Sequence, residues 1–166
     1  MNLIQHFVDG KILKGTSKRN GKVFNPATGE QSGEVNFATT DDVNKAVSVA
    51  KKAFLNWSQK TPLFRARALF KFKELIEKNS DELTKIIVSE HGKVYEDAKG
   101  SLTRGLEVVE FACGIPQLLK GEFTENVGTN VDSWSVRQPL GVCAGITPFN
   151  FPAMVPMWMF PIAIAC

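Results

Sequence analysis

The first 36 residues alternate short β-prone runs with pairs of turn-forming residues. Asp9-Gly10 and Asn20-Gly21 can each supply the positive φ angles of a tight hairpin turn, and the run NPATGE at residues 25–30 is a third turn signal. This pattern predicts a small antiparallel segment over residues 6–36.

From Thr40 onwards the apolar residues recur at helical spacing, which predicts amphipathic helices. The first begins at Thr40 behind a threonine cap and two acids. Its apolar positions are Val43, Ala46, Val47, Ala50, Ala53, Phe54 and Trp57. The second begins at Thr61-Pro62, a cap followed by a first-turn proline. Its predicted inward face is Phe64, Ala68, Phe72, Leu75 and Ile76.

Two more helices are predicted to follow. One starts at Ser80 and ends at the glycine stop Gly92. The other covers residues 94–112, ends at Gly114, and turns three apolar side chains inward: Leu102, Leu106 and Val109.

The remaining sequence changes character twice. Residues 122–138 form two polar extended runs around Gly128, and such a hairpin usually lies against another chain or domain because it buries little by itself. Leu140–Ile146 is a continuous apolar run, which predicts a strand covered on both faces in a parallel sheet. A turn at Thr147-Pro148 and a helix from about Pro152 complete a strand-turn-helix unit, so the predicted fold class is α/β.

Asn150 lies where this predicted strand passes into a helix, the place where open α/β sheets bind ligands. Phe149 and Phe151 flank it and exclude water, and Pro148 and Pro152 restrict the backbone on both sides. The amide NH2 is a neutral donor that can hold a developing oxyanion. The alternative is that Asn150 caps the following helix, for which asparagine is among the best residues.

Charge and cysteine content narrow the classes of function. The net charge of +3 comes from basic residues interleaved with acids, which argues against a nucleic-acid partner. Cys113, Cys143 and Cys166 are far apart in the sequence, which predicts reduced structural thiols in a cytosolic protein and no metal site. The first residues have neither a signal-peptide nor a transit-peptide pattern, so a cytoplasmic location is predicted.

Residues 139–166 carry no charge and exceed the roughly 20 residues that span a bilayer, so a membrane anchor is one alternative. Four prolines in this stretch argue against it, because each removes a backbone donor. The final run PIAIAC has no stop signal, which predicts that the chain is a fragment and that its last element is cut.

The run PFNFP at residues 148–152 resembles the Pro-aromatic-Asn-Phe-Pro signature of the NAD(P)-dependent aldehyde dehydrogenases. The following AMVPMWMFP is similar to one branch, the CoA-acylating methylmalonate- and malonate-semialdehyde dehydrogenases. The resemblance runs from VDGK and NPATGE to VRQPLGVCAGITPFNFP and covers about the first third of such an enzyme. It implies the amino-terminal part of a Rossmann-type NAD-binding domain, divided into residues 1–121, an oligomerisation hairpin at 122–138, and a strand-turn-helix at 139–166.

The resemblance also implies roles for individual residues. Asn150 would donate its amide to the oxyanion formed when a cysteine thiolate attacks the aldehyde. The loop along the nicotinamide-ribose side of NAD would be Ile146, Thr147, Pro148 and Phe149, and the lining of the substrate tunnel would be Phe151, Val155 and Trp158. Arg104 would bind the substrate carboxylate. The alternatives are core packing for Val155 and Trp158, and a surface pair with Glu107 or Glu110 for Arg104.

The implied reaction is oxidation of a (methyl)malonate semialdehyde with NAD and CoA, through a cysteine thioester and with loss of CO2. The implied assembly is a dimer of dimers joined through the hairpin. None of the three cysteines aligns with the nucleophile, so the chain alone is predicted to be inactive. Two alternatives stay open: a non-acylating enzyme that releases a free acid, and a non-catalytic fragment that binds other subunits. The preference for malonate or methylmalonate semialdehyde is undecided.

Overall fold

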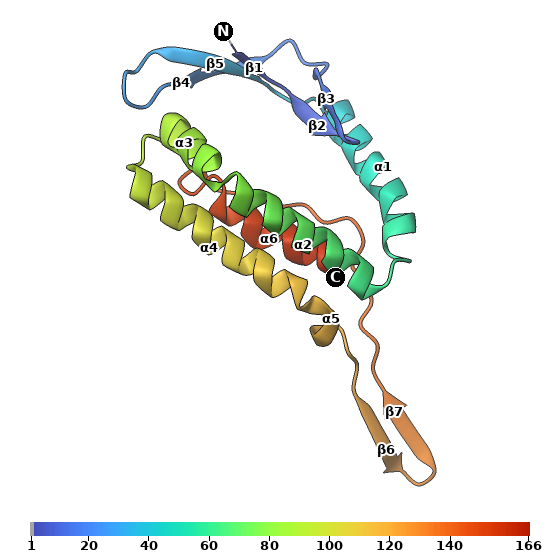
Figure 1. Ribbon diagram of the computed structural model, residues 1–166. Coiled ribbons are helices and arrows are strands. Elements are labelled where there is room, and N and C mark those ends of the chain that lie inside the picture. The colour runs from blue at the N-terminus through green and yellow to red at the C-terminus, as the bar shows by residue number, and fades with distance from the viewer. Residues whose placement is uncertain (1) are drawn as a thin grey trace.

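The computed structural model describes residues 2–166 (Figure 1). The strands are β1 (Asn2–Ile4), β2 (His6–Val8), β3 (Lys11–Leu13), β4 (Asn20–Phe24), β5 (Gln31–Asn36), β6 (Phe123–Gly128) and β7 (Val131–Trp134). The helices are α1 (Thr40–Trp57), α2 (Pro62–Lys78), α3 (Ser80–His91), α4 (Tyr95–Cys113), α5 (Ile115–Leu118) and α6 (Met154–Ala165). Figure 1 shows strands β1–β5 along one side, α2–α6 gathered into a helical body, and the β6–β7 hairpin projecting away from it.

The N-terminal strands form a hairpin and a three-stranded sheet. β2 and β3 pair around Asp9-Gly10, whose φ angles are 56° and 71°, so this predicted turn is confirmed. The sheet has the order β1-β5-β4, and β5 pairs antiparallel with β4 but parallel with β1. Both pairings within the predicted segment, residues 6–36, are antiparallel, which confirms the prediction. The parallel pairing involves β1, which precedes that segment.

The other two predicted turns have opposite outcomes. The loop at residues 25–30 joins β4 to β5, and the side-chain oxygen of Asn25 accepts a hydrogen bond from the Ala27 N–H at 2.9 Å. The prediction of a turn at Asn20-Gly21 is wrong, since both residues begin β4 and pair with β5. Asn36 donates its side-chain amide to the Asn20 side-chain oxygen at 2.8 Å, which ties this end of β4 to its partner strand.

The predicted helix starts and stops are confirmed where capping chemistry sets them. Thr39 and Asp42 form a reciprocal capping box at the start of α1, and hydrogen bonds from the Thr39 N–H and hydroxyl help to lower the pKa of Asp42 to about 2. The Thr61 hydroxyl accepts from the Phe64 N–H at 3.3 Å at the start of α2. Gly92 ends α3 with φ 80°, a conformation that favours glycine.

The inward face of α2 differs from the predicted one. Phe64, Ala68 and Leu75 are exposed, whereas Arg65 and Leu69 are buried. α2 carries apolar residues on more than one side, so its own sequence does not determine which face is buried. The buried face is the one against which α4 and α6 pack.

The core lies between α2, α3, α4, α5 and α6 and consists of two clusters. The buried members of the first are Leu69, Ala112, Cys113, Ile115 and Ala165. The buried members of the second are Ile87, Ala98, Leu102, Val109 and Met157. α1 has the predicted length and apolar pattern but buries no residue, because no described element packs closely along its apolar face.

Residues 140–146 do not form the predicted strand. Leu140 and Ile146 are 95% and 96% exposed, as they would be in an unpaired segment. A strand exists only when neighbouring strands satisfy its backbone groups, and no described strand lies beside this one. The helix that follows begins at Met154, two residues later than predicted.

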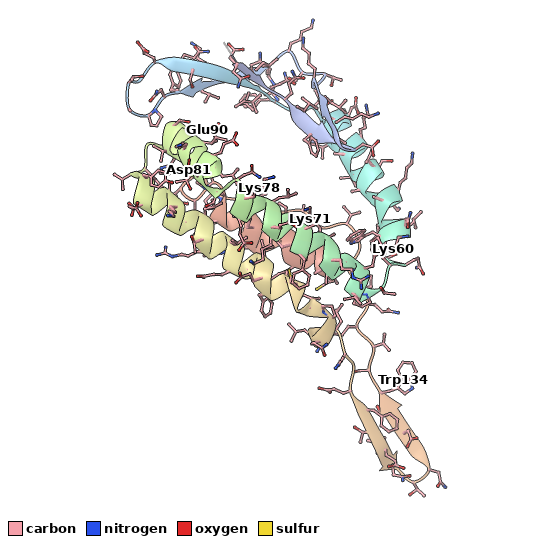
Figure 2. The ribbon with its side chains drawn as sticks, viewed as in Figure 1. Lys60, Lys71, Lys78, Asp81, Glu90 and Trp134 are labelled. Carbon is pink, nitrogen blue, oxygen red and sulfur yellow. The ribbon has the colours of Figure 1, made fainter. Side chains whose placement is uncertain are left out.

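A β6–β7 hairpin forms within the predicted residues 122–138, but β7 ends at Trp134, and the hairpin buries none of its residues. Its apolar side chains are largely open, among them Trp134, which is 71% exposed and lies on the projecting arm in Figure 2. This arm therefore gains little stability from the rest of the chain.

Candidate functional site

Asn150 lies on an exposed loop that leads into α6. Every residue from 142 to 150 is exposed, and the Asn150 side chain makes no hydrogen bond to any of residues 2–166. The N-cap of α6 is Ala153, which has no side-chain cap, so the prediction that Asn150 caps this helix is wrong. The amide is thus free to donate to a ligand, as the predicted oxyanion role requires.

The four residues predicted to border NAD occupy the same exposed loop. Ile146, Thr147, Pro148 and Phe149 have main-chain groups that bond to no other described residue. Phe149 is 88% exposed. Such a segment can offer its N–H and C=O groups to a ligand, except at Pro148, which has only a carbonyl.

The structure brings two of the predicted substrate residues together. Trp158 on α6 donates its indole N–H to the main-chain oxygen of Arg104 on α4, at 3.4 Å. Both side chains are exposed, Trp158 by 45%, so core packing is wrong for Trp158. Among residues 2–166, Arg104 forms the alternative surface pair with neither Glu107 nor Glu110. Glu110 pairs with Lys73 at 3.2 Å instead.

The other two predicted substrate residues lie at the start of α6. The Val155 N–H donates to the Phe151 main-chain oxygen at 3.3 Å, and both residues are half-buried. The Lys93 ammonium lies over the Phe151 ring, 4.0 Å from its centroid. Partial packing is therefore observed for Val155, and it leaves the tunnel role of this residue open.

A glycine that the sequence did not single out sets the spacing between α4 and α6. A Cβ atom at Gly105 would lie 3.1 Å from the Met154 Cα and 2.4 Å from the Met157 Cε. The two helices therefore meet where Gly105 has no side chain. Because Arg104 precedes this glycine, the close approach also places Trp158 against the Arg104 carbonyl.

Two side chains from other helices hold the last turn of α6, and sequence patterns gave no signal for either role. Arg65 is buried and donates to the main-chain oxygens of Ala165 at 2.9 Å and Lys60 at 2.6 Å. Trp57 on α1 donates its indole N–H to the Ile164 oxygen at 2.8 Å. The two donors thus connect α1 and α2 to the main chain at residues 164 and 165.

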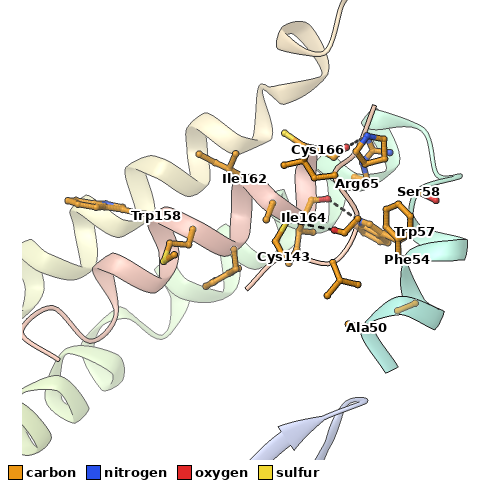
Figure 3. Close-up of a pocket in the computed structure, with 18 residues that line it drawn as sticks. Ala50, Phe54, Trp57, Ser58, Arg65, Cys143, Trp158, Ile162, Ile164 and Cys166 are labelled. Carbon is orange, nitrogen blue, oxygen red and sulfur yellow. Dashed lines mark hydrogen bonds between the residues drawn. The ribbon is translucent and has the colours of Figure 1, made fainter. Parts of the chain in front are cut away.

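An apolar groove of about 820 Å³ lies beside this clamp, between α1, residues 139–143 and α6 (Figure 3). Its walls include Phe54, Trp57, Val142 and Cys143. α6 has no polar residue, and a helix that is apolar all round is normally buried on every side. Here its outer face forms one wall of the groove.

The three cysteines have different environments. Cys113 is buried, and burial raises the pKa of its thiol, in keeping with the predicted packing role. Cys143 is exposed, so the prediction that it packs within a strand is wrong, because that strand has no neighbours here. Within residues 2–166, no cluster of three His, Cys, Asp or Glu side chains could hold a metal ion. Nor does any helix in this range have both the length and the apolar run to cross a bilayer.

The chain is similar along its length to a known class of proteins. Residues 12–166 match the aldehyde dehydrogenase family, and the chain belongs to that family. The predicted family and its α/β fold class are thereby confirmed.

The similar proteins fall in the predicted branch. The malonate-semialdehyde dehydrogenase of Pseudomonas aeruginosa is 49% identical over 166 residues, which are 100% of this chain and 33% of that enzyme. The acylating methylmalonate-semialdehyde dehydrogenase of Arabidopsis thaliana, named as mitochondrial, is 47% identical over 98% of this chain and 27% of its own length.

Solved structures agree with this branch. A crystal structure described as a methylmalonate-semialdehyde dehydrogenase of Sinorhizobium meliloti, in complex with NAD, has a TM-score of 0.97 and 52% identity over 100% of this chain and 34% of that one. The corresponding enzyme of Oceanimonas doudoroffii has a TM-score of 0.96 and 53% identity over the same shares. The chain thus spans about a third of the length of the relatives it matches, as expected from the sequence.

Proposed function

We propose that this chain forms part of an NAD-dependent, CoA-acylating dehydrogenase of malonate or methylmalonate semialdehyde. The observation that carries the proposal is the identity of 47% to 53% along nearly the whole chain with enzymes named for these two substrates. The exposed and unpaired amide of Asn150 supports it, because a donor committed to a helix cap could not serve a substrate.

The proposed role of Asn150 is to stabilise charge in the transition state. When a thiolate adds to the aldehyde carbon, the carbonyl oxygen becomes negative, and the Asn150 amide donates an N–H to it. A preorganised donor of this kind is worth about 2.7 to 4 kcal/mol, or about 10² to 10³ in kcat. The thiolate comes from a cysteine that is not among the three in this chain.

The NAD site is proposed to run along residues 146–149, whose exposed main-chain groups fit a ligand that needs donors and acceptors. NAD, when bound, supplies the hydride acceptor. Arg104 is proposed to bind the substrate carboxylate, with Phe151, Val155 and Trp158 lining the approach. CoA would then take the acyl group by attack of its thiol on the thioester, with loss of CO2 and formation of acetyl-CoA or propionyl-CoA.

A chimaeric enzyme tests the proposal directly. These 166 residues replace the matching segment of the Pseudomonas aeruginosa enzyme, and NADH formation is followed with each semialdehyde, with and without CoA. Asn150→Ala is expected to lower kcat by about 10² to 10³. The matched control is Asn44→Ala, because Asn44 is an exposed asparagine on α1, more than 100 positions before Asn150 in the sequence. An inactive chimaera would contradict the proposal, and a free acid as product would favour the non-acylating alternative.

The carboxylate role of Arg104 has its own test in the chimaera. Arg104→Leu is expected to raise KM for the semialdehyde far more than KM for an uncharged aldehyde of similar length, because only the first carries a carboxylate. Arg67→Leu, at an exposed position on α2, is the control. Equal changes in KM for the two substrates would contradict the assignment.

The hairpin is proposed to join subunits into a dimer of dimers, since it buries nothing within its own chain. Trp134→Asp would place a charge on its open apolar surface and is expected to lower the molar mass of the chimaera measured by light scattering. An unchanged mass would argue against the hairpin as the interface. A cytoplasmic location stays a prediction from the sequence.

A further inference from the structure

The loop that carries Asn150 is attached to the helical body at two points. On the amino side, Gly145 packs against Met159, since a Cβ atom there would lie 2.9 Å from the Met159 Cε. On the carboxyl side, the Phe151 ring lies under the Lys93 ammonium. Residues 146–150 make no hydrogen bond to any other described residue. The position of Asn150 therefore depends on these two ends.

The backbone at Lys93 is well placed to hold one of them. Lys93 is the single residue between Gly92, the left-handed C-cap of α3, and Val94, the N-cap of α4. Gly92 also lies against Pro26, whose Cγ would be 3.1 Å from a Cβ atom at that position. Two helix ends and a β-loop thus fix the corner from which the Lys93 side chain extends.

The contact between the ammonium and the ring is short. The Lys93 Nζ lies 4.0 Å from the ring centroid, well inside the limit of about 6 Å for a cation–π interaction. Both residues are half-buried, and Lys93 forms no ion pair with a described residue. The ring of Phe151 is therefore its described partner.

We propose that Lys93 is a positioning residue, whose ammonium holds Phe151 and thereby fixes the loop that presents Asn150. The expected effect on catalysis rests on the proposed function, whereas the contact between Lys93 and Phe151 can be measured without any enzyme activity. Asn150 touches the reacting oxygen, and Lys93 acts only through Phe151 and the backbone between them.

The first test is kinetic and uses the chimaera. Lys93→Met is expected to lower kcat about tenfold, between the two- to fivefold of an exposed cation–π contact and the hundredfold that a 1 Å misplacement can cost. KM for NAD and for the semialdehyde should change less than about twofold, because Asn150 acts in the transition state. Lys93→Arg should keep most of the activity, since a guanidinium also stacks on a ring. Lys99→Met, an exposed lysine on α4, is the control.

The double variant Lys93→Met with Phe151→Leu separates a shared role from two independent ones. If the two residues act as one unit, the double variant loses no more activity than the worse single variant. The proposal is overturned if the losses multiply, if Lys93→Met keeps kcat within about twofold, or if Lys93→Arg is as impaired as Lys93→Met.

The second test observes the contact itself in the 166-residue chain labelled with ¹³C-lysine. One lysine ε-methylene signal should be shifted upfield by the ring current of Phe151, and it should move to the ordinary position in Phe151→Leu. Absence of such a signal in the folded chain overturns the proposal whatever the activity of the chimaera. An inactive parent chimaera with the signal present would contradict only the proposed function.

Discussion

Replacing Gly105 with alanine tests the packing that positions the site. The new methyl group would lie 3.1 Å from the Met154 Cα and 3.3 Å from the Met157 Cβ, both closer than the usual carbon contact of about 3.5 to 4.0 Å. The Met157 Cε, at 2.4 Å, can move aside by rotation of its side chain. The Met154 Cα and the Met157 Cβ can move only together with α6. The helices must separate by roughly half an ångström, although Met154 and Met157 are each only 4% exposed.

The expected size follows from two opposing effects. Overpacking of a core costs about 1 to 3 kcal/mol, while alanine favours a helix over glycine by about 0.8 to 1.0 kcal/mol. We expect Gly105→Ala to lower the free energy of unfolding by up to about 2 kcal/mol, which corresponds to at most about 8 °C in Tm for a chain of this size. The packing loss exceeds the helix gain because the Met154 Cα and the Met157 Cβ cannot move away from the methyl group unless α6 moves.

Gly100→Ala is the matched control, since Gly100 lies on the same helix and a Cβ atom there meets nothing within 4 Å. This variant should be more stable than the parent by about 0.8 to 1.0 kcal/mol. Urea unfolding of the purified chain, followed by circular dichroism, measures both. If Gly105→Ala were as stable as Gly100→Ala, the close approach of α6 to α4 would not be set by this glycine.

Three further predictions concern stability, each measured by urea unfolding. The pKa of Asp42 is lowered to about 2, so its carboxylate stabilises the fold above the ordinary aspartate pKa and loses this effect as the pH falls towards 2. Asp42→Asn should therefore be less stable than the parent at pH 7 and about equally stable near pH 2. An equal difference at both pH values would contradict this. Arg65→Met should cost about 3 kcal/mol by leaving carbonyls unpaired, whereas the exposed Arg67→Met should change stability by less than about 0.5 kcal/mol. Gly92→Ala should lower the free energy of unfolding by about 1 to 2 kcal/mol, since the φ of 80° at residue 92 disfavours a side chain. An unchanged stability would contradict a left-handed conformation at this residue.

The sequence by itself determined the features that rest on local chemistry. Thr39 and Thr61 cap their helices, Gly92 ends one, and Asp9-Gly10 makes a turn, because each acts on backbone groups within a few residues of itself. The signature around Asn150 also pointed to the family before any packing was known, since it is contiguous in the chain.

Tertiary structure decided which surfaces meet. Leu140–Ile146 has the composition of a buried strand, but strand formation needs hydrogen-bonding neighbours, and none of the described strands supplies them. The packed face of α2, the clamp of Arg65 on α6 and the contact of Lys93 with Phe151 join residues that are distant in sequence. No local periodicity encodes them, because each depends on the position of a second element. The unbonded amide of Asn150 also depends on tertiary structure. The local sequence allowed Asn150 to be either a helix cap or an exposed donor. Because α6 begins at Met154 with Ala153 as its N-cap, Asn150 is not the cap and its amide stays exposed.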